Sequence, residues 1–211
     1  MGCDPKGVKR YEAILFDFDG VIVDSEPIHY ECWREILLPY GLDLDWGVYA
    51  EKGIGISDRA MLAMFAAEKD PPLDIEMLVG EYPRKKDMFR NRMLAEPSIS
   101  SEVIELLESL RGIYKLAVVT SSGRNEVEPI LDAAGILSKF DTAIYGGDVK
   151  RLKPAPDPYL LAAQRLQIGR ALVVEDSDAG VASGTAAGHD VLQVKNQAEM
   201  VERVRQRLES K

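Results

Sequence analysis

Cysteine, positive charge and long apolar runs are all in short supply in this sequence. Its two cysteines, Cys3 and Cys32, are too few for a disulfide framework or a thiolate zinc site, which favours a reducing compartment and hence the cytoplasm. The 26 Lys and Arg residues are outnumbered by 35 Asp and Glu residues, and the formal net charge of −9 disfavours nucleic acid as a partner. No apolar run approaches the roughly 18 residues of a membrane-spanning helix, so we expect no membrane partner.

The overall composition is typical of a soluble globular protein. Hydrophobic residues make up 46% and charged residues 29% of the 211 residues, a balance that excludes disordered and collagen-like chains. A chain of this length predicts one domain, or one domain with a sizeable insertion, and it buries enough surface to fold without disulfides.

Five short apolar runs alternate with helical patterns along most of the chain. Each run is nearly continuous in Ile, Leu, Val and Ala, as is typical of parallel strands that are buried on both faces of a sheet. The runs are residues 13–18, 116–120, 142–145, 171–175 and 191–194. The sequence therefore predicts an α/β fold with a parallel sheet. Gly169 stands where the helix before the fourth run should end.

Residues 25–97 interrupt this rhythm, because they contain helical patterns and no convincing strand. Within them, Ser57 is placed to cap a helix, and Pro83 predicts a kink or two consecutive helices. We expect an all-α cap domain over residues 25–97, inserted into a core that is made of residues 1–24 and 98–211.

Two carboxylates stand two residues apart at the end of the first apolar run. In an extended chain, residues i and i+2 face the same side, so Asp17 and Asp19 can share one pocket. The fourth run ends in a second acidic pair, Glu175 and Asp176. Open parallel sheets bind ligands at the carboxyl ends of their strands, and carboxylates without histidine or thiolate suit Mg²⁺.

Hydroxyl groups and a lysine follow the second and third runs. Thr120, Ser121 and Ser122 end the second run, where hydroxyls suit an oxyanion, and Lys153 follows the third. Each feature is weak alone, since an Asp-x-Asp pair is usually a solvated turn and a loop lysine is usually surface. Acid, hydroxyl, amine and acid at four successive strand ends together indicate an active site.

With these motifs the whole chain resembles the haloacid dehalogenase-like (HAD) hydrolase superfamily. Its phosphatases carry an Asp-x-Asp first motif, a Thr or Ser second, a Lys third and an acidic fourth. The segments DGVIVDSEP, KPAPDP and EDSDAG are similar to those of the beta-phosphoglucomutase/phosphoglycolate phosphatase-like subgroup. The resemblance implies a Rossmann-like HAD core with an inserted helical cap. It also implies a Mg²⁺-dependent phosphomonoester hydrolase, expected as a monomer or weak homodimer, that acts on a small phosphorylated metabolite such as a sugar phosphate or phosphoglycolate.

The resemblance assigns a role to each strand-end residue. Asp17 is the nucleophile that forms an aspartyl-phosphate, and Asp19 is the general acid and base. Thr120 and Lys153 hold the phosphoryl oxygens. The expected Mg²⁺ ligands are Asp17, Asp19, Glu175 and Asp176. Because a leaving halide needs no proton, the presence of Asp19 favours phosphate chemistry over dehalogenation.

Substrate contacts outside the catalytic set are expected at Ser121, Arg124, Lys85 and His29. Arg124 follows the second motif and either adds charge near the phosphate or faces solvent. Lys85 belongs to a basic stretch, residues 84–92, that is either a solvated helix face or a surface that reads the substrate. The position of Lys85 resembles that of a substrate-contacting cap lysine in beta-phosphoglucomutases. His29 falls where those enzymes place a histidine, or it helps to pack the first cap helix.

Two other functions stay open. A beta-phosphoglucomutase-like isomerase shares the same core, but Ile56 stands where an arginine for the distal phosphate is expected. A phospho-accepting signalling module, like a response-regulator receiver, also clusters Asp, Thr and Lys at strand ends, yet such modules are shorter and lack a helical cap. The sequence therefore favours the hydrolase.

Overall fold

The computed structural model describes residues 11–54 and 56–209, and all five predicted runs become strands of one sheet. The strands are β1 Ala13–Phe16, β2 Lys115–Val119, β3 Thr142–Ile144, β4 Ala171–Glu175 and β5 Asp190–Gln193. They are all parallel and lie in the order β3-β2-β1-β4-β5. The predicted α/β fold with a parallel sheet is therefore confirmed.

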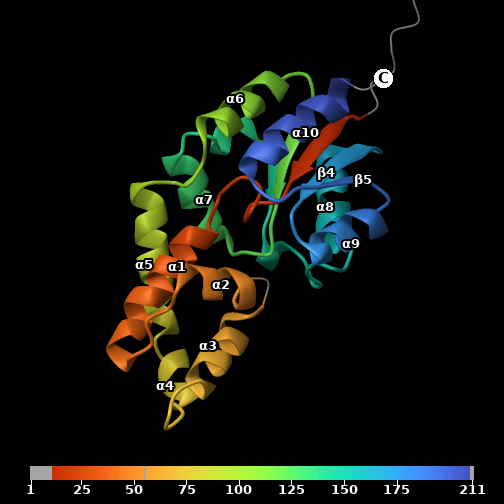
Figure 1. Cartoon of the computed structure of the whole chain (residues 1–211). Helices are drawn as coiled ribbons and strands as arrows, with labels where there is room; N and C mark the ends of the chain where they lie inside the picture. Colours follow the sequence, from red (N-terminus) through yellow and green to blue (C-terminus); the bar gives the residue numbers. More distant parts are fainter. Residues whose placement is uncertain (1–10, 55, 210–211) are drawn as a thin grey trace, which may run out of the picture. The chain divides into compact units, whose positions relative to one another are not determined.

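Helices bury the sheet on both faces (Figure 1). Every residue of β1 and β4 is buried, which is why these strands read as continuous apolar runs. Helix α8 packs on β2 and β3, α9 packs on β4 and β5, and α6 packs on α10. The helical elements of this part are α6 Ser101–Leu110, α7 Arg124–Ala133, η2 Leu137–Lys139, η3 Gly146–Asp148, α8 Asp157–Leu166, α9 Asp178–Ala186 and α10 Gln197–Glu209.

The strand register brings the predicted motifs to one edge of the sheet. Phe16, the last residue of β1, lies opposite Val118 of β2 and Val174 of β4. The residues that follow β2, β1 and β4 therefore emerge side by side at the carboxyl edge of the sheet, with those of β1 in the middle. This is the edge at which open parallel sheets bind their ligands.

Contacts divide the chain into two compact units, residues 1–24 with 99–211 and residues 25–98. The described part of the second unit contains helices and no strand, and Figure 1 draws it from orange to yellow-green. Its apolar core includes Trp33, Leu62, Phe65 and Leu78. The elements are α1 Glu26–Leu37, η1 Leu38–Tyr40, α2 Trp46–Lys52, α3 Asp58–Ala67, α4 Ile75–Val79 and α5 Tyr82–Ala95.

The predicted helix boundaries hold in the second unit and fail once in the first. Ser57 caps α3 by accepting a hydrogen bond from the Ala60 N–H, and the expected break at Pro83 appears as two helices, α4 and α5. The prediction that Gly169 ends the helix before the fourth run, α8, is wrong. Gln167 takes the left-handed conformation instead, with φ of 54°, and the next N–H, that of Ile168, closes the helix on the Ala163 carbonyl.

Among the described residues, no helix combines the length and the apolar character needed to cross a membrane. Cys32 is buried in α1, whereas Cys3 lies outside the described residues.

Candidate active site

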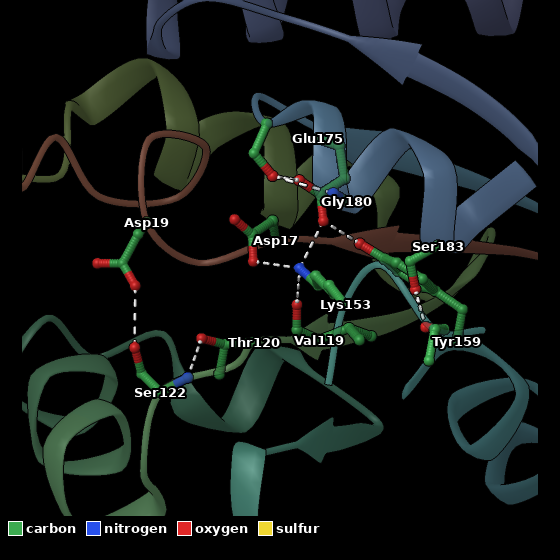
Figure 2. A network of polar contacts seen from close by, with 12 residues as sticks. Asp17, Asp19, Val119, Thr120, Ser122, Lys153, Tyr159, Glu175, Gly180 and Ser183 are labelled. Carbon is green, nitrogen blue, oxygen red and sulfur yellow. Dashed lines mark hydrogen bonds and ion pairs between the residues drawn. The ribbon is translucent and has the colours of Figure 1, made fainter. Parts of the chain in front are cut away.

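A buried lysine joins two carboxylates at the carboxyl edge of the sheet (Figure 2). The Lys153 ammonium lies 2.6 Å from Asp17 Oδ1 and 2.5 Å from Glu175 Oε1, and it donates a third hydrogen bond of 2.9 Å to the Val119 carbonyl. The side chains are only 7%, 11% and 0% exposed for Lys153, Asp17 and Glu175. All three ammonium protons therefore have an oxygen partner inside the protein.

Burial shapes the ionisation of this cluster. Burial raises the pKa of Asp17 to about 8, although the charge of Lys153 pulls it down, and the nearby Glu175 and Asp19 push it further up. Burial lowers the pKa of Lys153, but Asp17 and Glu175 outweigh it and raise that pKa above its ordinary value. Burial, followed by the charge of Glu175, also raises the pKa of Asp176 to about 6. The cluster therefore holds more negative charge than one lysine can neutralise.

Asp17, Glu175 and Asp176 form the carboxylate group that fits a metal ion. Each offers an oxygen, and these oxygens lie within 4.8 Å of one another. A donor set made only of carboxylate oxygens suits a hard cation such as Mg²⁺. Asp19, which was predicted as a fourth ligand, does not belong to this group.

Glu175 is already engaged by the protein. Its Oε1 accepts hydrogen bonds from Lys153 and from the Tyr159 hydroxyl at 2.5 Å, and its Oε2 accepts one from the Ser177 hydroxyl at 3.2 Å. In Figure 2 the second oxygen of Asp17 points away from Lys153. The carboxylates of Asp17 and Asp176 are therefore the better donors for a cation, and Glu175 is foremost the partner of Lys153.

Two glycines let the acidic side chains of the fourth motif reach their positions. A Cβ on Gly20, whose φ is +74°, would lie 2.1 Å from Asp176 Oδ2. A Cβ on Gly180, in the first turn of α9, would lie 1.9 Å from Glu175 Cδ. Any side chain at either position would displace a carboxylate, since such contacts are far below van der Waals distance.

A hydrogen-bond chain connects the second motif to Asp19. The Ser122 hydroxyl donates to Asp19 Oδ2 at 3.1 Å, and the Ser122 N–H donates to Thr120 Oγ1 at 3.0 Å. Thr120 is buried, and its own N–H donates to the Ile144 carbonyl at 2.9 Å, which fixes the end of β2. Figure 2 shows both hydroxyls on the Asp19 side of the cluster.

Three residues of this site were not singled out as site residues from the sequence: Tyr159, Ser177 and Gly180. Tyr159 has a weak signal, because it follows Lys153 by six residues on the buried face of a helix. Nothing in the local sequence indicates that its hydroxyl contacts Glu175.

Ser121 and Arg124 do not join this cluster through their side chains in the described structure. Ser121 is exposed, and its carbonyl oxygen lies against Gly146. Arg124 is exposed, lies 3.3 Å from Glu128 and 3.9 Å from Asp148, and stacks on the Tyr145 ring at 4.4 Å. The structure thus favours a local structural role for Arg124.

Lys85 and His29 contact each other in the helical unit. Lys85 Nζ lies 2.6 Å from His29 Nδ1 and 3.5 Å from Asp58 Oδ2, and Lys85 is only 4% exposed. The imidazole of His29 stacks on Phe89, with ring centres 4.1 Å apart. Burial, followed by the charge of Lys85, lowers the pKa of His29 to about 3. Burial also lowers the pKa of Lys85, although Asp58 raises it.

The rest of the basic stretch behaves as a solvated helix face. Arg84 pairs with Glu81 and Arg90 with Asp87 along the same helix. Arg92 pairs with two glutamates of α1, Glu31 and Glu35. Lys85 is therefore set apart from these arginines by its burial.

Comparison with known proteins agrees with this geometry. The family model of the haloacid dehalogenase-like hydrolases matches residues 14–194. The chain belongs to this family. It is 34% identical over 190 residues to fructose-1-phosphate phosphatase YqaB of Escherichia coli, an alignment that covers 89% of this chain and 98% of that protein.

Two further comparisons extend the match within the family. The phosphorylated carbohydrates phosphatase of Thermotoga maritima is 33% identical over 182 residues, which cover 84% of this chain and 82% of that protein. The crystal structure of CbbY from Rhodobacter sphaeroides in complex with phosphate superposes with a TM-score of 0.63 at 28% identity and covers 87% of each chain. The resemblance to HAD phosphatases is thus confirmed for this hydrolase.

Proposed function

We propose that this HAD hydrolase is a Mg²⁺-dependent phosphatase that cleaves a small sugar phosphate or phosphoglycolate-like monoester through an aspartyl-phosphate. The observation that carries the proposal is the buried contact of Lys153 with both Asp17 and Glu175, next to Asp176. The phosphatase names of its relatives support the same reaction class.

Asp17 is the proposed nucleophile. Lys153 holds Oδ1 of its carboxylate, which leaves the second oxygen to attack phosphorus. Two unit charges about 4 Å apart repel by about 4 kcal/mol at an effective dielectric near 20, so the anionic nucleophile and substrate need positive charge between them. Lys153 supplies one such charge, and the hydroxyl of Thr120 supplies a donor for the phosphoryl oxygens.

Asp17 and Asp176 would hold a Mg²⁺ ion. When bound, the ion supplies the remaining positive charge and polarises a phosphoryl oxygen. The carboxylate oxygens of Asp17 and Asp176 lie within 4.8 Å of each other, which supports this assignment.

Asp19 is the proposed general acid and base. It protonates the leaving alkoxide, and the same carboxylate then takes a proton from the water that hydrolyses the acyl phosphate on Asp17. The Ser122 hydroxyl donates a hydrogen bond to Oδ2 of Asp19, which ties this carboxylate to the end of β2. One residue thereby serves both half-reactions.

The helical unit is the proposed cap that selects the substrate, with domain limits at residues 25–97 and a core of residues 1–24 and 98–211. Lys85 and His29 are its proposed substrate-contacting side chains, since the buried Lys85 ammonium contacts the half-buried imidazole of His29. We further propose that the enzyme acts in the cytoplasm as a monomer or weak homodimer. An isomerase is not favoured, because Ile56 replaces the arginine expected for a second phosphate and the compared relatives are phosphatases.

The test is phosphate release from a panel that includes fructose 1-phosphate, phosphoglycolate and β-glucose 1-phosphate, each with Mg²⁺ and with EDTA. We expect release with Mg²⁺ only, and none from Asp17→Asn. The matched control is Asp43→Asn, which removes an exposed carboxylate paired with Arg34 and should keep full activity. Full activity of Asp17→Asn would exclude the nucleophile assignment, and conversion of β-glucose 1-phosphate to glucose 6-phosphate without phosphate release would restore the isomerase.

A further inference from the structure

Tyr159 donates a hydrogen bond to the carboxylate that holds Lys153. Its hydroxyl lies 2.5 Å from Glu175 Oε1, and the residue is fully buried on the sheet-facing side of α8. The ring packs in an apolar cluster with Ala162, Leu166 and Val173. A buried phenol can make this hydrogen bond in only a narrow range of orientations, so its position defines where Oε1 must lie.

Lys153 and Tyr159 converge on the same oxygen. In Figure 2 the dashed lines from both residues meet at Oε1 of Glu175. Oε2 accepts from Ser177, whose hydroxyl also accepts from the Gly180 N–H at 3.1 Å. The backbone of Gly180 closes the remaining side, because even a methyl group there would collide with the carboxylate.

The ring of Tyr159 also contacts the lysine end of the network. Lys153 Nζ lies 5.3 Å from the ring centre, a distance at which a cation and an aromatic face attract each other. Tyr159 therefore bears on Lys153 in two ways, through Oε1 of Glu175 and through its own π face.

We infer that Tyr159 is a positioning residue that orients Glu175 and thereby holds the Lys153 ammonium against Asp17. It makes no contact with the nucleophile, and its effect passes through the carboxylate and the lysine. This inference rests on the proposed function, in which Lys153 stabilises the phosphoryl group. It extends that function to a tyrosine that follows the lysine motif by six residues.

The variant Tyr159→Phe tests the inference, because it removes the hydroxyl and keeps the ring. The matched control is Tyr40→Phe, which removes a hydroxyl that donates to Glu81 at 2.8 Å in the helical unit. With p-nitrophenyl phosphate and saturating Mg²⁺, we expect kcat to fall about tenfold in Tyr159→Phe, which equals about 1.4 kcal/mol of transition-state stabilisation. We expect KM and the thermal unfolding midpoint to stay close to those of the wild type, and Tyr40→Phe to keep its kcat.

A second readout does not depend on activity. The protected Lys153 ammonium should give a lysine Nζ–H resonance in ¹H–¹⁵N spectra of the metal-free chain, identified by its loss in Lys153→Met. Tyr159→Phe should shift or broaden this resonance, and Tyr40→Phe should not. An unchanged resonance, or a kcat equal to that of the control, would overturn the inference. An inactive wild type with the shifted resonance would overturn only the proposed reaction and leave the positioning role supported.

Discussion

Removal of the buried lysine should expose how strongly the site depends on its charge. The variant Lys153→Met keeps most of the side-chain volume and removes the ammonium that bridges Asp17 and Glu175. The lysine is only 7% exposed and Glu175 is fully buried, so water cannot replace the lost partner. Removing one member of a buried ion pair typically costs about 3–5 kcal/mol, because the remaining charge stays uncompensated. We therefore expect a loss of about 3–5 kcal/mol in the free energy of unfolding.

The assay is urea unfolding followed by circular dichroism at pH 8, with EDTA present so that no cation substitutes for the lysine. The control is Lys139→Met, because Lys139 lies 2.8 Å from a glutamate, Glu108, whose side chain is 58% exposed. An ion pair with a solvated partner contributes only about 0–1 kcal/mol, so the control should lose far less. Equal losses in the two variants would refute the reasoning.

The double variant Lys153→Met with Glu175→Gln separates charge from packing. It removes the lysine together with the carboxylate that it neutralises, so one buried charge fewer is left unpaired. We expect part of the stability lost in Lys153→Met to return in the double variant, and we expect no phosphatase activity in either variant. If the stability losses of the two single variants, Lys153→Met and Glu175→Gln, simply add in the double variant, the contact is not a charge pair.

Three further predictions follow from the geometry. In Gly180→Ala, the new Cβ would lie 1.9 Å from Glu175 Cδ, so kcat should fall about tenfold or more. The control Gly147→Ala should keep its kcat, because no atom lies within 4 Å of a Cβ at that position. Equal kcat values in the two variants would contradict the close approach of Gly180 to Glu175. Asp176→Asn should raise the Mg²⁺ concentration for half-maximal activity about tenfold or more, and the exposed Asp178→Asn should not; an unchanged requirement would exclude Asp176 as a ligand. His189 is buried, and neither ring nitrogen has a hydrogen-bond partner among the described residues. Burial lowers its pKa in the folded state, so the unfolded chain takes up the proton first as pH falls below about 6.5, and stability should fall by up to about 1.4 kcal/mol per pH unit. Urea titrations at pH 7 and pH 5 should show a smaller acid loss in His189→Gln than in the wild type; equal losses would refute this origin.

The sheet could be predicted from the sequence because its strands are buried on both faces. Residues 171–175 are apolar up to the final glutamate, and the structure buries every one of them. The same pattern places the motif residues at the ends of the runs, where parallel strands share one edge. The contact between Asp17 and Lys153, which are 136 residues apart in the chain, follows from that topology.

The rest of the site depends on side-chain directions that no periodic pattern records. The sequence places Glu175 beside Asp176 as expected ligands, but Glu175 is the last residue of β4 and Asp176 lies beyond the strand, so the two side chains meet different partners. Glu175 therefore turns to Lys153 and Tyr159, while Asp176 lies against Gly20. Gln167 illustrates a second limit. Gly169 suggests where the helix ends, but the helix ends earlier, at Gln167, through its own backbone hydrogen bonds.

The two buried lysines differ in what compensates their charge. Lys153 has three oxygen acceptors within 2.9 Å, two of them carboxylates, and its pKa is raised despite burial. Lys85 has one carboxylate oxygen at 3.5 Å and a neutral imidazole nitrogen at 2.6 Å, and its pKa is lowered because burial outweighs Asp58. The chain itself thus fixes the charge of Lys153, whereas an additional anion beside Lys85 would stabilise its ammonium form. This imbalance supports the proposal that Lys85, in addition to its pair with Asp58, contacts an acidic group of the substrate.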